Sequence, residues 1–146
     1  MKVLLPDGAA AGADPILDIL KKYKTIAVVG LSSDPTRPSN GVSQYMHASG
    51  YRIIPVNPNE REVLGERSYG RVEDVPEKVE IVDIFRRAED VPPAVESAIR
   101  AGAKVIWMQL GIENAQAAEK ARAAGLTVVM DSCILVEHKK RRQSLP

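Results

Sequence analysis

The stretch Thr25-Ile26-Ala27-Val28-Val29-Gly30-Leu31-Ser32-Ser33 carries the main indication of the fold. Its first five residues form an almost continuous apolar run rich in β-branched side chains, which is typical of a parallel strand buried on both faces. Gly30 then permits a tight turn, and a polar loop leads toward a helix that begins near Ser39. A buried strand, a loop of small residues and a helix together predict the first unit of an α/β domain.

Four more apolar runs follow, and helical stretches separate them. Strands are predicted at 25–30, 51–56, 80–85, 104–109 and 126–130, and helices from 15, 39, 91 and 114 onward, before a basic C-terminal helix or tail. Pro55 lacks a backbone donor, which favours a strand end or a one-sided position in the sheet. Such alternation with short connections predicts right-handed βαβ units. We therefore expect an α/β, Rossmann-like, doubly wound fold: a five-stranded, mainly parallel sheet of order 3-2-1-4-5 with helices on both faces.

The size and composition agree with one globular domain. We expect residues 1–146 to form a single domain, with 1–13 and 141–146 as flexible ends. The hydrophobic fraction of 45% and charged fraction of 27% are those of a globular chain. A formal net charge of +1 and only 4% aromatic residues argue against a nucleic-acid-binding protein.

Cysteine content and hydropathy indicate the cellular compartment. Cys133 is the only cysteine, so the sequence predicts neither an internal disulfide nor a structural zinc site. No apolar run approaches the ~18 residues of a membrane span, and residues 1–12 lack the apolar core of a signal peptide. We therefore expect a cytoplasmic protein without metal or membrane association.

The loop after the first predicted strand is the main candidate site. In doubly wound sheets, ligands bind outside the carboxyl ends of the strands, at the point where the strand order reverses. Small residues that lead to a helix N-terminus offer N–H groups and a positive dipole end to an anion. Ser32 and Ser33 add hydroxyl groups, and Arg37 adds a guanidinium fork suited to phosphate. The alternative is a polar connection that binds nothing.

A nicotinamide cofactor fits this loop less well. The dinucleotide fingerprint requires glycines where this chain has Ser32 and Pro35. It also requires a carboxylate after the second strand for the ribose hydroxyls, but this segment reads Val56-Asn57-Pro58-Asn59. An amide beside a proline better suits a neutral or phosphorylated ribose and the edge of adenine. The Gly-Lys-Ser/Thr motif of ATP-hydrolysing loops is absent as well.

Several motifs together resemble the small CoA-binding domain proteins of bacteria and archaea. They are Val28-Val29-Gly30-Leu31-Ser32, Asp34-Pro35, Arg37-Pro38-Ser39, Pro55-Val56-Asn57-Pro58, Val82-Asp83-Ile84-Phe85, Trp107-Met108-Gln109, Cys133 and Glu137-His138. The resemblance runs from about Asp14 to His138. The chain is more distantly similar to the nucleotide-binding domain of the succinyl-CoA synthetase α subunit.

The resemblance implies coenzyme A as the ligand. The pyrophosphate is expected over residues 30–33 with Arg37 near a phosphate, the adenosine beside residues 57–59, and the pantetheine along Phe85, Arg86 and Gln109. The expected contact residues are Gly30, Leu31, Ser32, Ser33, Arg37, Pro38, Val56, Asn57, Pro58, Asn59, Phe85, Arg86, Gln109 and Cys133. The phospho-histidine domain of the synthetase has no counterpart in these 146 residues, so ligase chemistry is not implied.

The expected function is binding of CoA or acyl-CoA by a carrier or regulator, with no catalytic residues assigned. A mixed disulfide of Cys133 with the CoA thiol stays open beside a buried, inert cysteine. Glu137 and His138 are neighbours in sequence and are expected to point to different sides of a helix. The alternatives are an NAD(P)-dependent oxidoreductase and a subunit of a CoA enzyme that is completed by a partner chain.

Overall fold

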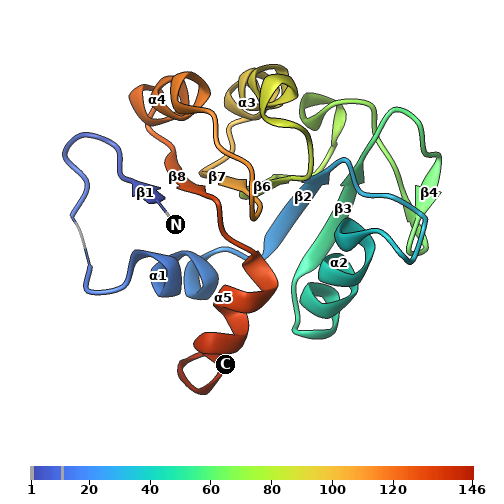
Figure 1. The fold of residues 1–146 in the computed structure, drawn as a ribbon, viewed down its shortest axis with the longest axis horizontal. Helices are drawn as coiled ribbons and strands as arrows, with labels where there is room; N and C mark the ends of the chain where they lie inside the picture. The colour runs from blue at the N-terminus through green and yellow to red at the C-terminus, as the bar shows by residue number, and fades with distance from the viewer. Residues whose placement is uncertain (1, 11) are drawn as a thin grey trace.

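A computed structural model describes residues 2–10 and 12–146. Its main sheet has six strands in the order β1-β8-β7-β6-β2-β3 (Figure 1). These strands are β1 (Lys2–Leu4), β2 (Thr25–Val29), β3 (Arg52–Val56), β6 (Ile81–Ile84), β7 (Val105–Met108) and β8 (Thr127–Met130). The last five are the strands predicted from the sequence, and each pairs in parallel with its neighbour among them. The predicted α/β fold with a mainly parallel sheet is therefore confirmed.

The order of the five parallel strands differs from the prediction. Numbered along the chain, they run 2-1-3-4-5 rather than 3-2-1-4-5. The reason lies in β6, whose four residues are all buried, as befits a strand covered on both faces and paired on both edges. β3 forms the sheet edge instead, where Arg52 is exposed and the missing donor of Pro55 is tolerated. Residues 57–80 carry the chain from that edge back past β2.

The sheet also has a sixth strand that the sequence does not predict. Lys2–Leu4 pairs antiparallel with β8, with Val3 opposite Val129. Lys2 forms an ion pair of 2.8 Å with Glu113. This strand lies within residues 1–13, where the sequence predicts a flexible end, and the flexibility of that segment stays a prediction. Three residues are too short a run for an alternating pattern to be read.

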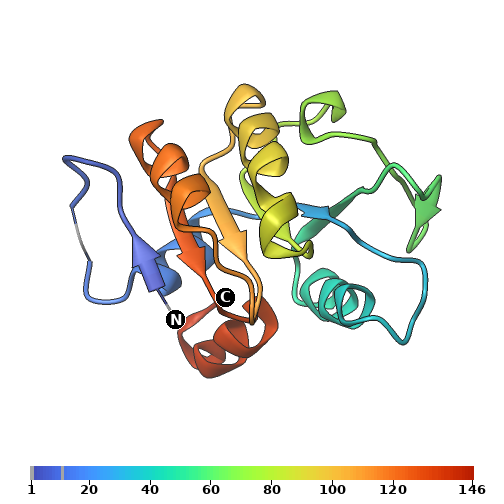
Figure 2. The same ribbon diagram turned by 45° about the horizontal axis from the view of Figure 1, so that its top comes forward.

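Five helices cover the two faces of the sheet (Figures 1 and 2). One face carries α1 (Pro15–Lys22), α2 (Pro38–Ala48) and α5 (Ile134–Lys140), and the other carries α3 (Val91–Arg100) and α4 (Ala115–Ala123). Two helix starts follow the sequence directly, because the side chains of Asp14 and Asn114 accept hydrogen bonds from the first turns of α1 and α4. Predicted helices on both faces are thus confirmed.

Four short elements, besides β6, lie between β3 and α3. β4 (Glu62–Val63) and β5 (Glu66–Arg67) form a small hairpin, and the 3₁₀ helices η1 (Val72–Asp74) and η2 (Ala88–Asp90) follow. A further 3₁₀ turn, η3 (Arg142–Ser144), lies near the C-terminus. No helix in the described part of the chain is long and apolar enough to cross a membrane.

Candidate ligand-binding site

The carboxyl edge of the sheet is hollowed at its switch point. From β2 the chain passes through α2 to β3 on one side, and β6 pairs with β2 on the other. A crevice is expected where the connections to the neighbouring strands run in opposite directions. A cavity of about 510 Å³ opens there. We call it the loop cavity; its lining includes Gly30, Ser32, Arg37, Pro38, Ser39, Asn57, Phe85, Arg86, Arg87 and Ile112.

Gly30 brings two strand ends together beneath this cavity. Its φ of +87° lies in the left-handed region that favours glycine. A β-carbon at this position would collide with the backbone carbonyl oxygen of Phe85. The Gly30 N–H donates to the carbonyl of Val56 at 2.8 Å, which ties the loop to the end of β3. The predicted tight turn is therefore required for packing as well as for chain direction.

The loop after Gly30 is held by hydrogen bonds from two elements. The Ser32 N–H donates to Ser39 Oγ at 3.0 Å, and Asn40 Nδ2 donates to the Ser32 carbonyl at 2.9 Å. From the other side, Asn57 Nδ2 donates to the carbonyl of Leu31 at 3.0 Å. The Leu31 side chain is fully buried in the core. The loop is thus held in place by its own hydrogen bonds, and Leu31 lines neither the loop cavity nor the cavity that adjoins it.

The positive charge of the loop cavity comes from guanidinium groups and a helix end rather than from loop N–H groups. The N–H of Ser32 is engaged by Ser39, and that of Ser33 donates to Glu60 Oε2 at 2.7 Å. The N-terminal residues of α2 line the cavity, and no side chain caps that helix. Three arginines also line it, of which Arg87 pairs with Glu89 and Asp90. No carboxylate lines the cavity among the described residues, so its chemistry suits an anion.

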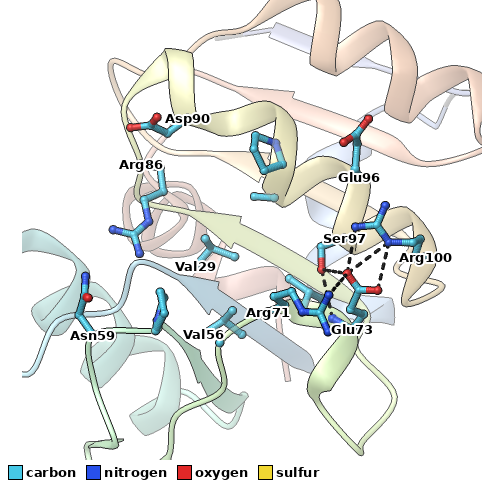
Figure 3. Close-up of a pocket in the computed structure, with 15 residues that line it drawn as sticks. Val29, Val56, Asn59, Arg71, Glu73, Arg86, Asp90, Glu96, Ser97 and Arg100 are labelled. Carbon is cyan, nitrogen blue, oxygen red and sulfur yellow. Dashed lines mark hydrogen bonds and ion pairs between the residues drawn. The ribbon is translucent and has the colours of Figure 1, made fainter.

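A second cavity of about 450 Å³ adjoins the first, and Arg86 lines both (Figure 3). It lies between the ends of β2 and β3, η1 and α3, and we call it the α3 cavity. Its apolar lining comes from Val29, Val56, Pro58, Val72, Pro93 and Ala94. Figure 3 shows Arg86 on the side of the cavity nearest Asn59, away from the charged cluster at the other end. The apolar wall of the α3 cavity, beside the basic loop cavity, suits a ligand that has both a flat ring and phosphate groups.

The far end of the α3 cavity is a closed ion-pair network (Figure 3). Arg100 Nη2 donates to Glu73 Oε1 at 2.9 Å, and Ser97 Oγ donates to the same oxygen at 3.2 Å. Arg71 approaches Glu73 at 3.6 Å. The hydrogen bond from Arg100 lowers the pKa of Glu73 below its ordinary value. These charges are satisfied by one another, so the network fixes η1 on α3 and forms a wall.

Asn57 lines the loop cavity and is hydrogen-bonded to Asn59 and Arg86, which line the α3 cavity. It is buried, and its Oδ1 accepts from the Asn59 N–H at 3.0 Å and, at the limit of a hydrogen bond, from Arg86 Nη2 at 3.5 Å. The same side chain donates to the loop. One amide therefore sets the positions of the phosphate-side loop, the segment after β3 and Arg86. Pro58 and Asn59 are exposed beside it.

Gln109, which the resemblance places along the pantetheine, is not among the residues that line the two cavities. Its side chain is buried, and Nε2 donates to Asp83 Oδ1 at 2.6 Å. Burial raises the pKa of Asp83 to about 7, against the opposing effect of this hydrogen bond. Gln109 lines neither cavity. The alternation of strand side chains explains this, because Gln109 faces the same side as Trp107, whose indole is buried in the core.

Cys133, Glu137 and His138 lie farther along the same edge. Cys133 is partly buried and lines a third cavity, of about 250 Å³, near α5. Glu137 accepts from Arg141 at 2.9 Å, whereas His138 Nδ1 is 2.8 Å from the hydroxyl of Tyr45. The two neighbours thus have different partners, as expected from adjacent helix positions.

The main residues that sequence reasoning missed are those of η1 and α3. Residues 70–73 and 93–100 line much of the α3 cavity. Their signal is weak, because residues 59–79 show no regular pattern and α3 has the ordinary pattern of a surface helix. These residues lie over the end of β3 only because the chain turns back from β3 to form β6.

The fold is that of a Rossmann-like α/β protein, and the two adjoining cavities at the switch point of its sheet form a candidate ligand site. A family model described as a CoA binding domain matches residues 24–139. The chain therefore belongs to the CoA-binding domain family, which confirms the resemblance read from its motifs.

Relatives with curated sequences include both small and large proteins. The uncharacterized protein YneT of Bacillus subtilis is 42% identical over 84% of this chain and 91% of its own length. The ADP-forming acetate–CoA ligase I of Archaeoglobus fulgidus is 32% identical over 76% of this chain. That match spans only 18% of the ligase, so this chain corresponds to one part of it.

Solved structures show the same fold. A hypothetical protein from Pyrococcus horikoshii superposes with a TM-score of 0.84 at 44% identity, over 86% of this chain and 88% of that one. A protein from Thermus thermophilus gives a TM-score of 0.81 at 35% identity, over 84% and 93%. The similarity thus covers most of each of these small proteins.

Proposed function

We propose that this protein binds coenzyme A across the loop cavity and the α3 cavity, as a carrier or regulator rather than a catalyst. The observation that carries the proposal is that the basic loop cavity meets, at Arg86, the α3 cavity, which has an apolar wall as well as ion pairs. Such a pair fits a ligand with phosphates and a purine base. Membership of the CoA-binding domain family supports CoA among ligands of that kind.

The charge of each compartment supports one orientation of the ligand. The diphosphate takes the loop cavity, where Arg37, Arg86 and the N-terminus of α2 supply donors. The adenine takes the α3 cavity between Val56 and Ala94, with Asn59 near its edge. The pantetheine then leaves past Phe85 and Ile112, both of which line the loop cavity.

The lining chemistry supports binding without catalysis. Among the described residues, neither cavity is lined by a histidine, cysteine or lysine. Each carboxylate that lines the α3 cavity has a partner: Glu73 is held by Arg100 and Ser97, Asp90 by Arg87, and Glu96 by Lys120. Nucleophilic and general acid–base mechanisms need a nucleophile or base free to reach the substrate.

Calorimetric titration with CoA, dephospho-CoA and NAD tests the proposal. CoA should bind in preference to NAD. Because Arg37 lines the loop cavity and is absent from the α3 cavity, Arg37→Ala should weaken CoA and dephospho-CoA alike, each by roughly tenfold for a lost charge-assisted hydrogen bond.

The matched control is Lys104→Ala, which removes an exposed charge at the opposite edge of the sheet, just before β7. It should leave both affinities unchanged. Tight NAD binding with no heat from CoA at near-millimolar concentration would refute the proposal. A loss confined to CoA in the Arg37 variant would move this arginine to the 3′-phosphate.

A second candidate is a CoA-holding subunit that acts with a partner chain. The similarity to part of the acetate–CoA ligase favours it. The chain alone would then bind CoA, and turnover of acetyl-CoA with ADP and phosphate would appear only after a second polypeptide from the same cell is added. Unaided binding with no turnover in any such mixture favours the carrier.

A further inference from the structure

A third cavity lies on the carboxyl edge of the sheet, near the ends of β7 and β8. Its volume is about 250 Å³, and we call it the rim cavity. Leu110, Val136 and Cys133 form the apolar part of its lining, and the polar part comes from Asp131, Ser132, Glu137 and Lys140. Leu110 follows β7, and Val136 belongs to α5, which comes directly after β8 in the chain (Figure 1).

The two apolar residues of the rim cavity are unusually exposed. Leu110 is 71% exposed and Val136 42%, and Leu64 is the other large apolar residue so exposed in the described chain. Single exposed apolar residues are ordinary, but these two line one cavity. Its wall is also fixed, because the Gly111 N–H donates to Asp131 Oδ1 at 2.7 Å. A preformed cavity with apolar side chains on part of its wall suits a small apolar group of a ligand.

A backbone hydrogen bond links the lining of the loop cavity to that of the rim cavity. Ile112 lines the loop cavity, and its carbonyl accepts from the Asp131 N–H at 3.2 Å. Asp131 in turn lines the rim cavity. One hydrogen-bonded pair of loops thus borders both cavities.

The spacing of the strands fits the length of the pantetheine arm. Neighbouring strands lie about 4.8 Å apart, so the end of β8, three strands beyond β2, is roughly 14 Å from the Gly30 loop. The arm from the diphosphate to the sulfur has about twelve bonds, as many as about four residues of extended chain, which span roughly 13–14 Å. With adenine at β3 and diphosphate at β2, the sulfur reaches the rim cavity.

We propose that the rim cavity holds the acyl group of a short aliphatic acyl-CoA, so that the preferred ligand is an acyl thioester rather than free CoA. The inference rests on the proposed function, because it needs CoA bound in the orientation described. The acyl chain covers Leu110 and Val136, which free CoA leaves in water. A long chain is excluded because Asp131 and Lys140 bring charges to the same small cavity.

Calorimetric titration of the full chain with CoA, acetyl-CoA and butyryl-CoA tests this inference. Butyryl-CoA should bind more tightly than acetyl-CoA, by up to about fourfold for each methylene that leaves water. Leu110→Ser should abolish that preference while leaving the affinity for free CoA unchanged, which also shows that the variant is folded. Leu64→Ser is the control, because Leu64 is also an exposed leucine, at 42% against 71% for Leu110, but lies in the β4–β5 turn.

The outcomes separate the two proposals. If CoA binds but the acyl chain length has no effect, or if Leu110→Ser keeps the butyryl preference, the rim cavity is not an acyl site and the CoA proposal stands. If none of the three ligands binds, the proposed function fails and the acyl site with it. Loss of the preference in Leu110→Ser alone supports the inference.

Discussion

At the scale of single residues, Gly30 matters in three ways: through its backbone conformation, through the packing of the strand ends, and as part of the lining of the loop cavity. Its φ of +87° and its close approach to the Phe85 carbonyl both exclude a β-carbon. Gly50 has a similarly positive φ of +100°, but a β-carbon there would meet nothing within 4 Å. A comparison of these two glycines therefore separates the free-energy cost of the left-handed conformation from the free-energy cost of a steric collision.

We expect Gly30→Ala to destabilise the protein more than Gly50→Ala does. The left-handed conformation alone costs about 1–2 kcal/mol for an alanine, and Gly30→Ala adds the displacement of Phe85 and of the loop tied to Val56. Urea unfolding of the two variants measures the difference, and CoA titration should show weakened binding in the first only. Equal urea midpoints for the two variants would mean that the loop accommodates a β-carbon at residue 30 with no added cost in free energy of unfolding.

Residue identity in the site is predicted better than residue orientation. The sequence identifies Gly30, Arg37, Asn57 and Arg86, and all four line the loop cavity. It does not show that the side chain of Gln109 turns into the core toward Asp83. The position at which a strand ends determines whether the next side chain still points into the core. This sequence gives no clear indication of where its strands end.

At the scale of elements, strand order is the feature that the sequence leaves undetermined. Both 3-2-1-4-5 and 2-1-3-4-5 are doubly wound orders built from right-handed crossovers. They differ in the path of residues 57–80, which form a hairpin and η1 rather than an ordinary crossover helix. The informative signal is the buried run of β6, in which Asp83 is nearly inaccessible to solvent. A carboxyl group in such a position indicates a central strand rather than an edge.

The position of Asp83 predicts a pH dependence of stability. Burial raises its pKa from an ordinary 3.8 to about 7, so the folded state holds this proton more tightly than the unfolded state. Its contribution is therefore most favourable below about pH 4, and it is lost as pH rises toward 7, at up to about 1.4 kcal/mol per pH unit. Asp83→Asn keeps an acceptor for Gln109 and should gain stability relative to the native chain as pH rises.

Urea unfolding of both proteins between pH 4 and 8 measures this effect. The free energy of unfolding of the native chain should fall relative to the variant over that range and level off above pH 7. Asp34→Asn is the control, because hydrogen bonds from Thr36 lower the pKa of the exposed Asp34, so that the change in its effect on stability lies below about pH 4 and its curve should stay parallel to that of the native chain over this range. Parallel curves for native and Asp83→Asn would show that this carboxyl ionises as freely in the folded state as in the unfolded one.

At the scale of the whole molecule, net charge says little about the ligand. The formal charge is +1, yet the described lining of the loop cavity has three arginines and no carboxylate. Many of the other charges are neutralised locally, as in the pairs of Arg52 with Glu77 and Arg141 with Asp14. A field confined to one cavity concentrates a polyanion there without a basic protein overall.

Two substitutions that change the net charge equally should therefore differ in their effect on binding. Arg86→Gln and Lys104→Gln each remove one positive charge, the first between the two proposed ligand cavities and the second at the opposite edge of the sheet. Arg86→Gln should weaken CoA roughly tenfold and reduce the salt dependence of the affinity. Lys104→Gln should change neither, because salt at 0.15 M screens exposed charges beyond about 8 Å. Titrations at low and moderate salt decide between them, and an equal loss in both variants would mean that CoA responds to the overall charge and that the cavity has no field of its own.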